Sequence, residues 1–292
     1  MRLLLTGASG LLGGRLLQLL DGRFEVVAGR HLSSVRGASV ALDLADSRSL
    51  GAALDEARPD ALVSSAALAD ADACEREPER AFALNRDAPA SLARLCRRRG
   101  VRLVHLSTDL VLPGDRAFHD ERTTLPGPSL VYARSKLEGE SAVLAEWPQA
   151  AVLRVALVAG RGHGARATAS ESLRWSLDAG RRVRLFHDQW RTPIDPESVA
   201  ELLARLLSAE ATGIFHAGGP ERLSRLELGQ RVARAFGLDP GLIDAASAAS
   251  AQAAAPRPAD ASLGCERARR ELGWTARPLD AVIAESREAP EA

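Results

Sequence analysis

A glycine-rich turn near the start of the chain constrains the fold more than any other feature. The apolar run Leu3-Leu4-Leu5-Thr6 leads directly into Gly7-Ala8-Ser9-Gly10-Leu11-Leu12-Gly13, and an apolar-periodic segment follows as far as Leu20. Short apolar runs are typical of buried strands, and apolar periodicity is typical of helices. Glycines between a first strand and a first helix let a pyrophosphate approach the backbone at the helix N-terminus. The pattern therefore predicts a dinucleotide-binding turn.

Strands and helices continue to alternate through the first half of the chain. Further strands are expected at 24–28, 39–42, 61–64, 101–106 and 152–158, and helices at 50–57, 78–98 and 130–147. This alternation indicates an α/β fold, a doubly wound parallel sheet of the Rossmann type. We expect residues 1–158 to form this NAD(P)-binding domain. Residues 159–292, with shorter helices expected at 171–179, 197–207 and 225–236, should form a smaller C-terminal substrate-binding lobe that is partly interleaved with the core.

The composition excludes several classes of partner. The 38 Lys and Arg side chains balance the 38 Asp and Glu side chains, so no strong field would recruit nucleic acid or an anionic membrane. Cys74, Cys96 and Cys265 are far apart in the sequence, which argues against a disulfide framework or a metal site. No hydrophobic segment is long enough for a signal peptide or a membrane span. We expect a soluble, cytoplasmic protein that binds a small molecule and no metal.

Tyr132 and Lys136 are the only tyrosine and the only lysine in the chain. Residues four apart on a helix share a face, so both side chains can reach one reacting group. A nearby cation favours the phenolate, and we therefore expect Lys136 to lower the pKa of the Tyr132 phenol. A phenol prepared in this way is suited to proton transfer. Such a pair also occurs on ordinary helix surfaces, so the interpretation depends on the other motifs.

The residues after the second strand indicate which dinucleotide is bound. An acidic residue at this position binds the 2′-hydroxyl of NAD, whereas an arginine accommodates the 2′-phosphate of NADP. This chain has Gly29-Arg30-His31, which favours NADP over NAD, unless Arg30 is only a surface arginine. Asp43 would accept a hydrogen bond from the adenine amino group or is an ordinary loop aspartate. The predicted cofactor-binding residues are Gly7, Ser9, Gly10, Leu11, Gly13, Arg30, Asp43, Leu44, Ala66, Tyr132 and Lys136.

With the glycine turn, the hydroxyls of Ser107-Thr108 after a central strand, and Tyr132 with Lys136, the sequence resembles the extended short-chain dehydrogenase/reductase superfamily. Within it, Leu106-Ser107-Thr108-Asp109, Arg191-Thr192-Pro193, Arg257-Pro258 and Leu272-Gly273-Trp274 look most like the dTDP-4-dehydrorhamnose reductases. The resemblance implies that Tyr132 donates a proton to a carbonyl oxygen, that Lys136 holds the nicotinamide ribose, and that Thr108 orients the carbonyl. Asn85 would sustain a proton relay or be a buried structural asparagine. A homodimer is also implied.

The resemblance implies an NADPH-dependent reductase of a keto group on a nucleotide-activated sugar or a similar carbonyl compound. The residues expected to bind the substrate are Ser107, Asp109, Arg154, Gln189 and Arg191. For the last three, surface or interlobe salt bridges are the alternative. Leu110 stands where these reductases often have an aromatic residue. That departure keeps open a regulatory subunit without turnover, similar to the methionine adenosyltransferase beta subunit. A sugar epimerase that retains NAD is a third interpretation, and Arg30 speaks against it.

Overall fold

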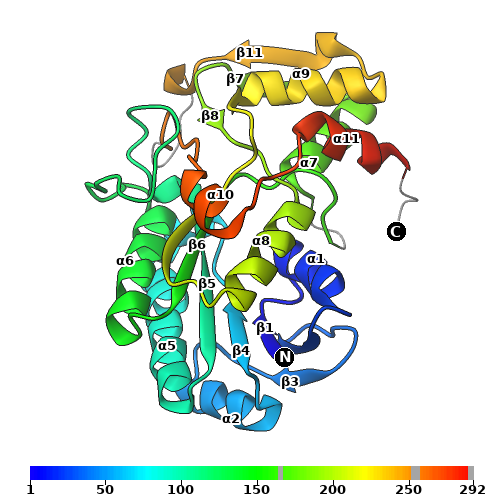
Figure 1. Ribbon diagram of the computed structural model, residues 1–292. Helices are drawn as coiled ribbons and strands as arrows, with labels where there is room; N and C mark the ends of the chain where they lie inside the picture. Colours follow the sequence, from blue (N-terminus) through cyan, green and yellow to red (C-terminus); the bar gives the residue numbers. More distant parts are fainter. Residues whose placement is uncertain (164–166, 251–256, 289–292) are drawn as a thin grey trace.

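The centre of the molecule is a seven-stranded sheet whose adjacent strands are all parallel (Figure 1). A computed structural model describes residues 1–163, 167–250 and 257–288. The strand order is β3-β2-β1-β4-β5-β6-β9, which confirms the predicted doubly wound α/β fold. The strands are β1 (Arg2–Thr6), β2 (Glu25–Arg30), β3 (Ser39–Ala41), β4 (Ala61–Ser64), β5 (Arg102–Thr108), β6 (Ala151–Val155) and β9 (Gly213–Ala217).

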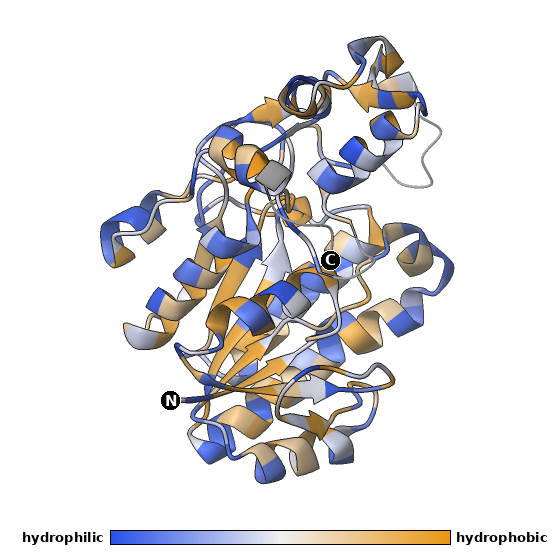
Figure 2. Cartoon of the chain, turned by 90° about the vertical axis from the view of Figure 1, so that its right-hand side faces the viewer, coloured by the Kyte–Doolittle hydropathy of each residue, from blue (hydrophilic) through white to orange (hydrophobic). Residues whose placement is uncertain are grey.

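Helices cover both faces of the sheet, which explains why its strands are continuously apolar. Successive residues of a strand point to opposite faces. Accordingly, Leu3 and Leu5 of β1 pack into one hydrophobic cluster, and Leu4 packs into the other. One face is covered by α1 (Leu11–Leu20), α8 (Pro196–Ser208) and α10 (Glu266–Leu272), and the other by α2 (Ser47–Ala57), α5 (Ala88–Arg99) and α6 (Val131–Glu146). Figure 2 shows the hydrophobic strands lying between these helical layers.

A smaller lobe lies beyond the carboxyl ends of the strands, at the top of Figure 1. It contains two small sheets, which pair β7 (Val183–Phe186) with β11 (Ile243–Ala246) and β8 (Trp190–Arg191) with β10 (Leu223–Ser224). Its helices are α7 (Ala169–Asp178), α9 (Arg225–Phe236) and α11 (Leu279–Glu288), with short η3 (Pro240–Leu242) and η4 (Ala248–Ser250). Although α8 and β9 come from the C-terminal half of the sequence, α8 packs on the main sheet and β9 is the strand at its edge. The chain therefore returns to the core after entering the lobe.

The helix predicted at 78–98 is interrupted. It consists of α4 (Pro78–Phe82), a π-helical turn η1 (Ala83–Asp87) and α5, and it is preceded by α3 (Ala71–Arg76), which the sequence did not predict. A π turn holds one residue more than an α turn, and periodicity does not reveal it. The strand predicted at 152–158 ends at Val155. Together these differences change the local geometry around Asn85 and the entrance to the lobe.

Polar side chains replace apolar ones at the carboxyl ends of the central strands, on the face that α5 and α6 cover. Leu103 of β5 packs into the hydrophobic cluster of that face, and alternation places His105 and Ser107 on the same side. The backbone register pairs Ser64 with His105, and it aligns Ser107 with Arg154 and His216 on the next two strands. All of these side chains are buried. We call Ser64, His105, Ser107, Arg154 and His216 the polar band.

Candidate active site

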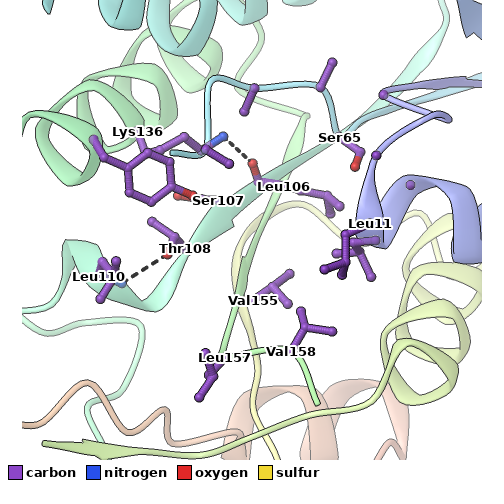
Figure 3. Close-up of a pocket in the computed structure, with 18 of the residues that line it drawn as sticks. Leu11, Ser65, Leu106, Ser107, Thr108, Leu110, Lys136, Val155, Leu157 and Val158 are labelled. Atoms are coloured by element: carbon purple, nitrogen blue, oxygen red, sulfur yellow. Dashed lines mark hydrogen bonds between the residues drawn. The ribbon is translucent and has the colours of Figure 1, made fainter. Parts of the chain in front are cut away.

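A cavity of about 1200 Å³ lies between the carboxyl edge of the sheet and the smaller lobe. The glycine turn lines one side of it, and Thr108, Tyr132 and Lys136 line another. In Figure 3, Leu11 of α1 lies across the cavity from Lys136 and Thr108, with Val155, Leu157 and Val158 on a further side. The fold therefore brings the predicted cofactor turn and the predicted catalytic side chains to one space.

The glycine turn fits closely under helix α1. A Cβ atom on Gly13 would lie 2.1 Å from the carbonyl oxygen of Gly7, so no larger residue can occupy this position without moving the turn. Helix α1 begins after Gly10, and no side chain caps its first turn. Its first N–H groups are thus left for another acceptor, and the turn lines the cavity. This arrangement suits the pyrophosphate of a dinucleotide.

At the adenosine end the structure differs from expectation. Ser9, Asp43, Leu44 and Ala66 line the cavity, whereas Arg30 does not. Arg30 is exposed, and its Nε donates a hydrogen bond over 3.3 Å to Oγ of Ser39 on the neighbouring strand β3.

His31 lines the cavity instead, with its Nε2 3.5 Å from Asp43 Oδ2. The sequence reasoning overlooked His31, although it adjoins the arginine that was singled out.

Tyr132 and Thr108 stand together at the top of β5. Tyr132 is in the first turn of α6, and Thr108 is the last residue of β5. The Thr108 hydroxyl donates to Asp109 Oδ1 over 3.1 Å and accepts from the Leu110 N–H over 3.2 Å. Burial raises the pKa of the Tyr132 phenol to about 12, while the Thr108 hydroxyl opposes this rise. The expected lowering of this pKa by Lys136 is therefore absent in the protein alone, and the phenol is protonated at neutral pH.

The ammonium of Lys136 points into the polar band. Its Nζ donates to the Leu106 carbonyl oxygen over 2.6 Å (Figure 3) and lies 3.2 Å from His105 Nε2. The side chain is 3% exposed, and burial lowers its pKa to about 8, with Glu140 opposing the change. These contacts explain why the lysine does not act on the Tyr132 phenol here.

Asn85 lies outside the cavity lining, within the π turn. Its Oδ1 accepts from the Leu68 N–H over 2.9 Å, and its Nδ2 donates to the Leu68 carbonyl and to Ser135 Oγ, both over 3.0 Å. A Cβ atom on Gly139 would lie 2.1 Å from the Asn85 carbonyl oxygen, so α6 packs directly against the turn. These contacts fix the segment after β4 against α6, as a structural asparagine would, and the role of Asn85 in a proton relay stays a prediction.

Arg154 does not line the cavity either, and this differs from its expected role as a substrate contact. It is 2% exposed, and its Nε and Nη2 donate to the Glu140 carboxylate, with a shortest distance of 2.7 Å. Its Nη1 lies 3.3 Å from His216 Nε2, and Ser107 Oγ donates to Glu140 Oε1 over 2.5 Å. A buried arginine requires such a partner, and Glu140 provides it from α6. Ser107 lines the cavity, but its hydroxyl is directed to this ion pair.

The far end of the cavity is cationic. Gln189 and Arg191, two of the residues expected to bind substrate, line it, and so do Arg225 and Arg257, which the sequence reasoning missed. Arg191 Nε lies 3.7 Å from Asp109 Oδ2, and burial raises the pKa of that carboxyl while Arg191 opposes the rise. Burial, followed by the charges of Arg191 and Arg257, lowers the pKa of Arg225 to about 10. Arg191 and Arg225 both interact with the single Asp109 carboxylate, and Arg257 interacts with both of these arginines. The excess of positive charge makes this wall suitable for an anion.

Comparison with known proteins identifies the family. The model of the RmlD substrate binding domain family matches residues 1–289 of the chain. The chain belongs to this family. It is an NAD(P)-dependent reductase of the extended short-chain dehydrogenase/reductase superfamily, as the motifs implied.

Individual relatives resemble the chain over most of its length. A probable low-salt glycan biosynthesis reductase, Agl14, from Haloferax volcanii is 33% identical over 96% of this chain and 95% of its own. The beta subunit of methionine adenosyltransferase 2 from Danio rerio is 30% identical over 91% of this chain and 83% of its own. The crystal structure of a hypothetical dTDP-4-dehydrorhamnose reductase from Sulfolobus tokodaii is 33% identical, with a TM-score of 0.84, and the match covers 94% of this chain and 96% of that one.

The residues of this reductase fit a nicotinamide dinucleotide. The turn at Gly7 to Gly13 leaves helix N–H groups for phosphate, and the cavity runs from there to Tyr132 and Lys136. In the described parts of the chain, no three metal-binding side chains gather in a way that would hold an ion. None of the helices in those parts has the length and apolar character needed to cross a membrane.

Proposed function

We propose that this protein reduces a keto group on a nucleotide-activated sugar, with NADPH as the reductant. One observation carries the proposal. A single cavity joins the glycine turn, the set Thr108, Tyr132 and Lys136, and the cationic wall of Arg191, Arg225 and Arg257. A nucleotide-activated keto sugar offers both a carbonyl for Thr108, Tyr132 and Lys136 and a diphosphate for the cationic wall.

Each of the catalytic side chains has a distinct task in this proposal. On substrate binding the Thr108 hydroxyl turns from Asp109 to donate to the substrate carbonyl, which orients the carbonyl and stabilises the charge that develops on its oxygen. Tyr132 donates its phenolic proton to that oxygen, and its raised pKa keeps the proton in place until it is needed. Lys136 holds the nicotinamide ribose with its ammonium. When bound, NADPH supplies the hydride that reaches the carbonyl carbon.

The test is direct turnover. Purified protein with NADPH and a panel of 4-keto nucleotide sugars is expected to oxidise NADPH with at least one of them, and mass spectrometry should find the reduced sugar. The proposal would be refuted if the protein neither reduced nor bound any member of the panel. The similarity to the hypothetical dTDP-4-dehydrorhamnose reductase from Sulfolobus tokodaii makes dTDP sugars the first compounds to try.

The cationic wall gives the next prediction. Replacing Arg225 by Met is expected to raise KM about tenfold or more with little change in kcat, because a lost charge-assisted contact to phosphate weakens binding in ground and transition states alike. Steady-state kinetics on the best substrate measure both constants. Arg234 lies on the same helix but is exposed and outside the cavity, so Arg234→Met is the matched control. Equal KM values in the two variants would contradict the proposed diphosphate site.

Cofactor preference gives another prediction. NADPH is expected to bind about tenfold or more tightly than NADH, because His31 lines the adenosine end of the cavity and a hydrogen bond to the charged 2′-phosphate is worth this much. Quenching of tryptophan fluorescence measures both dissociation constants. His31→Ala should weaken binding of NADPH alone, and Arg48→Ala, at an exposed position, should change the affinity for neither dinucleotide. Tighter binding of NADH would support an epimerase that retains NAD.

A regulatory subunit without turnover is a second candidate, favoured by the similarity to the methionine adenosyltransferase beta subunit. Tight retention of NADP and co-purification with a partner enzyme, together with no reduction of any sugar, would support it.

A further inference from the structure

Lys136 has three N–H donors, and the protein engages two of them. One donates to the Leu106 carbonyl oxygen over 2.6 Å, and His105 Nε2 lies 3.2 Å from the same nitrogen. An ammonium accepts no hydrogen bond, so His105 Nε2 must be the acceptor. Because these two contacts to β5 fix the directions of two ammonium N–H bonds, the direction of the third N–H bond is fixed as well. Among the described residues no further protein acceptor is bonded to Nζ, so this N–H is left for a ligand.

The imidazole of His105 is itself held in one state. It is fully buried, and its Nδ1 lies 3.2 Å from Ser64 Oγ on the neighbouring strand. Because Nε2 accepts from Lys136, Nδ1 carries the proton and donates to Ser64. Burial and the charge of Lys136 lower the pKa of His105 well below its ordinary value, so the ring stays neutral. A neutral ring of fixed tautomer is a rigid acceptor.

We propose that His105 is a positioning residue for Lys136, and that its Nε2 aims the remaining ammonium N–H at the ribose of the bound dinucleotide. The inference rests on the proposed function only in assigning Lys136 to the ribose. The contact between the two side chains exists without any ligand.

The contact with His105 also affects the charge of Lys136. Burial disfavours the charged ammonium, whereas a neutral acceptor favours it. Glu140 on α6 also favours the charged ammonium. Tyr132 lies one helical turn before Lys136 on the same helix, and the charges of Asp109 and of Cys74 on α3 act on its phenol. Loss of the acceptor at Nε2 should therefore lower the pKa of Lys136 further.

Three substitutions distinguish the role of Nε2 as a hydrogen-bond acceptor from the role of the His105 ring in filling space. His105→Gln can place an amide oxygen near the position of Nε2, within reach of Lys136. His105→Asn is shorter, so its amide can reach Ser64 but not the ammonium. His105→Leu fills the space with no polar atom. Only the Gln variant is expected to resemble the wild type.

Lysine labelled with carbon-13 at Cε gives one side-chain NMR signal in this protein, because Lys136 is its only lysine. We expect the pKa read from this signal to fall by about one unit in the Asn and Leu variants and to stay near the wild-type value in the Gln variant. The dissociation constant of NADPH should rise about tenfold in the first two variants. In the turnover assay, the decline of kcat/KM at high pH should begin correspondingly earlier.

Two outcomes would overturn the inference. One is an unchanged Lys136 pKa in the folded Asn variant, and the other is an equal loss of NADPH affinity in the Gln and Asn variants, which would indicate a purely structural role. Circular dichroism confirms folding, and if the Leu variant does not fold, the comparison of Gln with Asn still decides. NMR and NADPH binding need no sugar substrate, so failure of the proposed function would be seen separately as absence of turnover.

Discussion

Replacing Tyr132 by Phe is expected to lower kcat about a thousandfold, because a positioned general acid contributes about a hundredfold to ten-thousandfold to such reactions. The phenol is the protonated group beside Thr108 in the cavity, and burial keeps its pKa at about 12. The substitution removes a single oxygen and leaves the ring that packs against Cys74, Ala81 and Val131. Single-turnover measurements of NADPH oxidation test this expectation.

The affinity for NADPH is the control for this variant. A proton needed only in the transition state should not contribute to binding of the dinucleotide, so the dissociation constant is expected to stay close to that of the wild type. Wild-type turnover in the Phe variant would remove Tyr132 from the mechanism. A large loss of NADPH affinity would instead mean that the hydroxyl has a binding role.

Removing the carboxylate of Glu140 is expected to produce the largest loss of stability. Glu140→Ala leaves Arg154 buried without its bidentate partner, and breaking a buried ion pair in this way costs about 3–5 kcal/mol. Both side chains are at most 3% exposed, so solvent cannot replace the lost contact. Denaturant unfolding, monitored by circular dichroism, measures the change in the free energy of unfolding.

Two comparisons test the physical reason. In the double variant Glu140→Leu with Arg154→Met, no unpaired charge is left, so most of the lost stability should return. Arg94→Ala, which breaks the solvent-exposed pair with Glu146 near the end of α6, should have too little effect to measure. If Glu140→Ala and Arg94→Ala had similar effects, the buried pair would not be the stabilising feature that the structure indicates.

The sequence predicts the α/β core well because burial of the strands on both faces makes their sequences continuously apolar. Strands covered on both faces must be apolar throughout, as Leu3, Leu4 and Leu5 are, and the glycine turn shows which helix receives the phosphates. The smaller lobe is harder to predict from the sequence, since β8 and β10 have two residues each and their pairing depends on contacts between distant segments. The π turn leaves no periodic signal, because it replaces one helical turn with another that contains one more residue.

Residues of the candidate site can be predicted from the sequence only where they belong to a type that is rare in the chain. Tyr132 and Lys136 are unique in the chain and were found directly, whereas arginine provides all but one of the 38 basic side chains. Nothing local therefore distinguishes Arg225, which lines the cavity, from Arg154, which pairs with Glu140 beneath it. One clue was present for Arg154. An arginine inside a continuously apolar strand needs a buried carboxylate, and Glu140 follows Lys136 by one helical turn.

The π turn at Ala83–Asp87 makes this segment tolerant of a change in length that an α-helix would not absorb. An α-helix advances its side chains by about 100° per residue, and a π turn takes one residue more to complete about the same rotation. Deletion of one residue within the turn is therefore expected to give a regular α turn in which Leu92, Ala93 and Cys96 of α5 still face the sheet. A single-codon gap inside α5 itself would instead rotate these side chains away from the sheet, so alignments of relatives should place such a gap between Ala83 and Asp87.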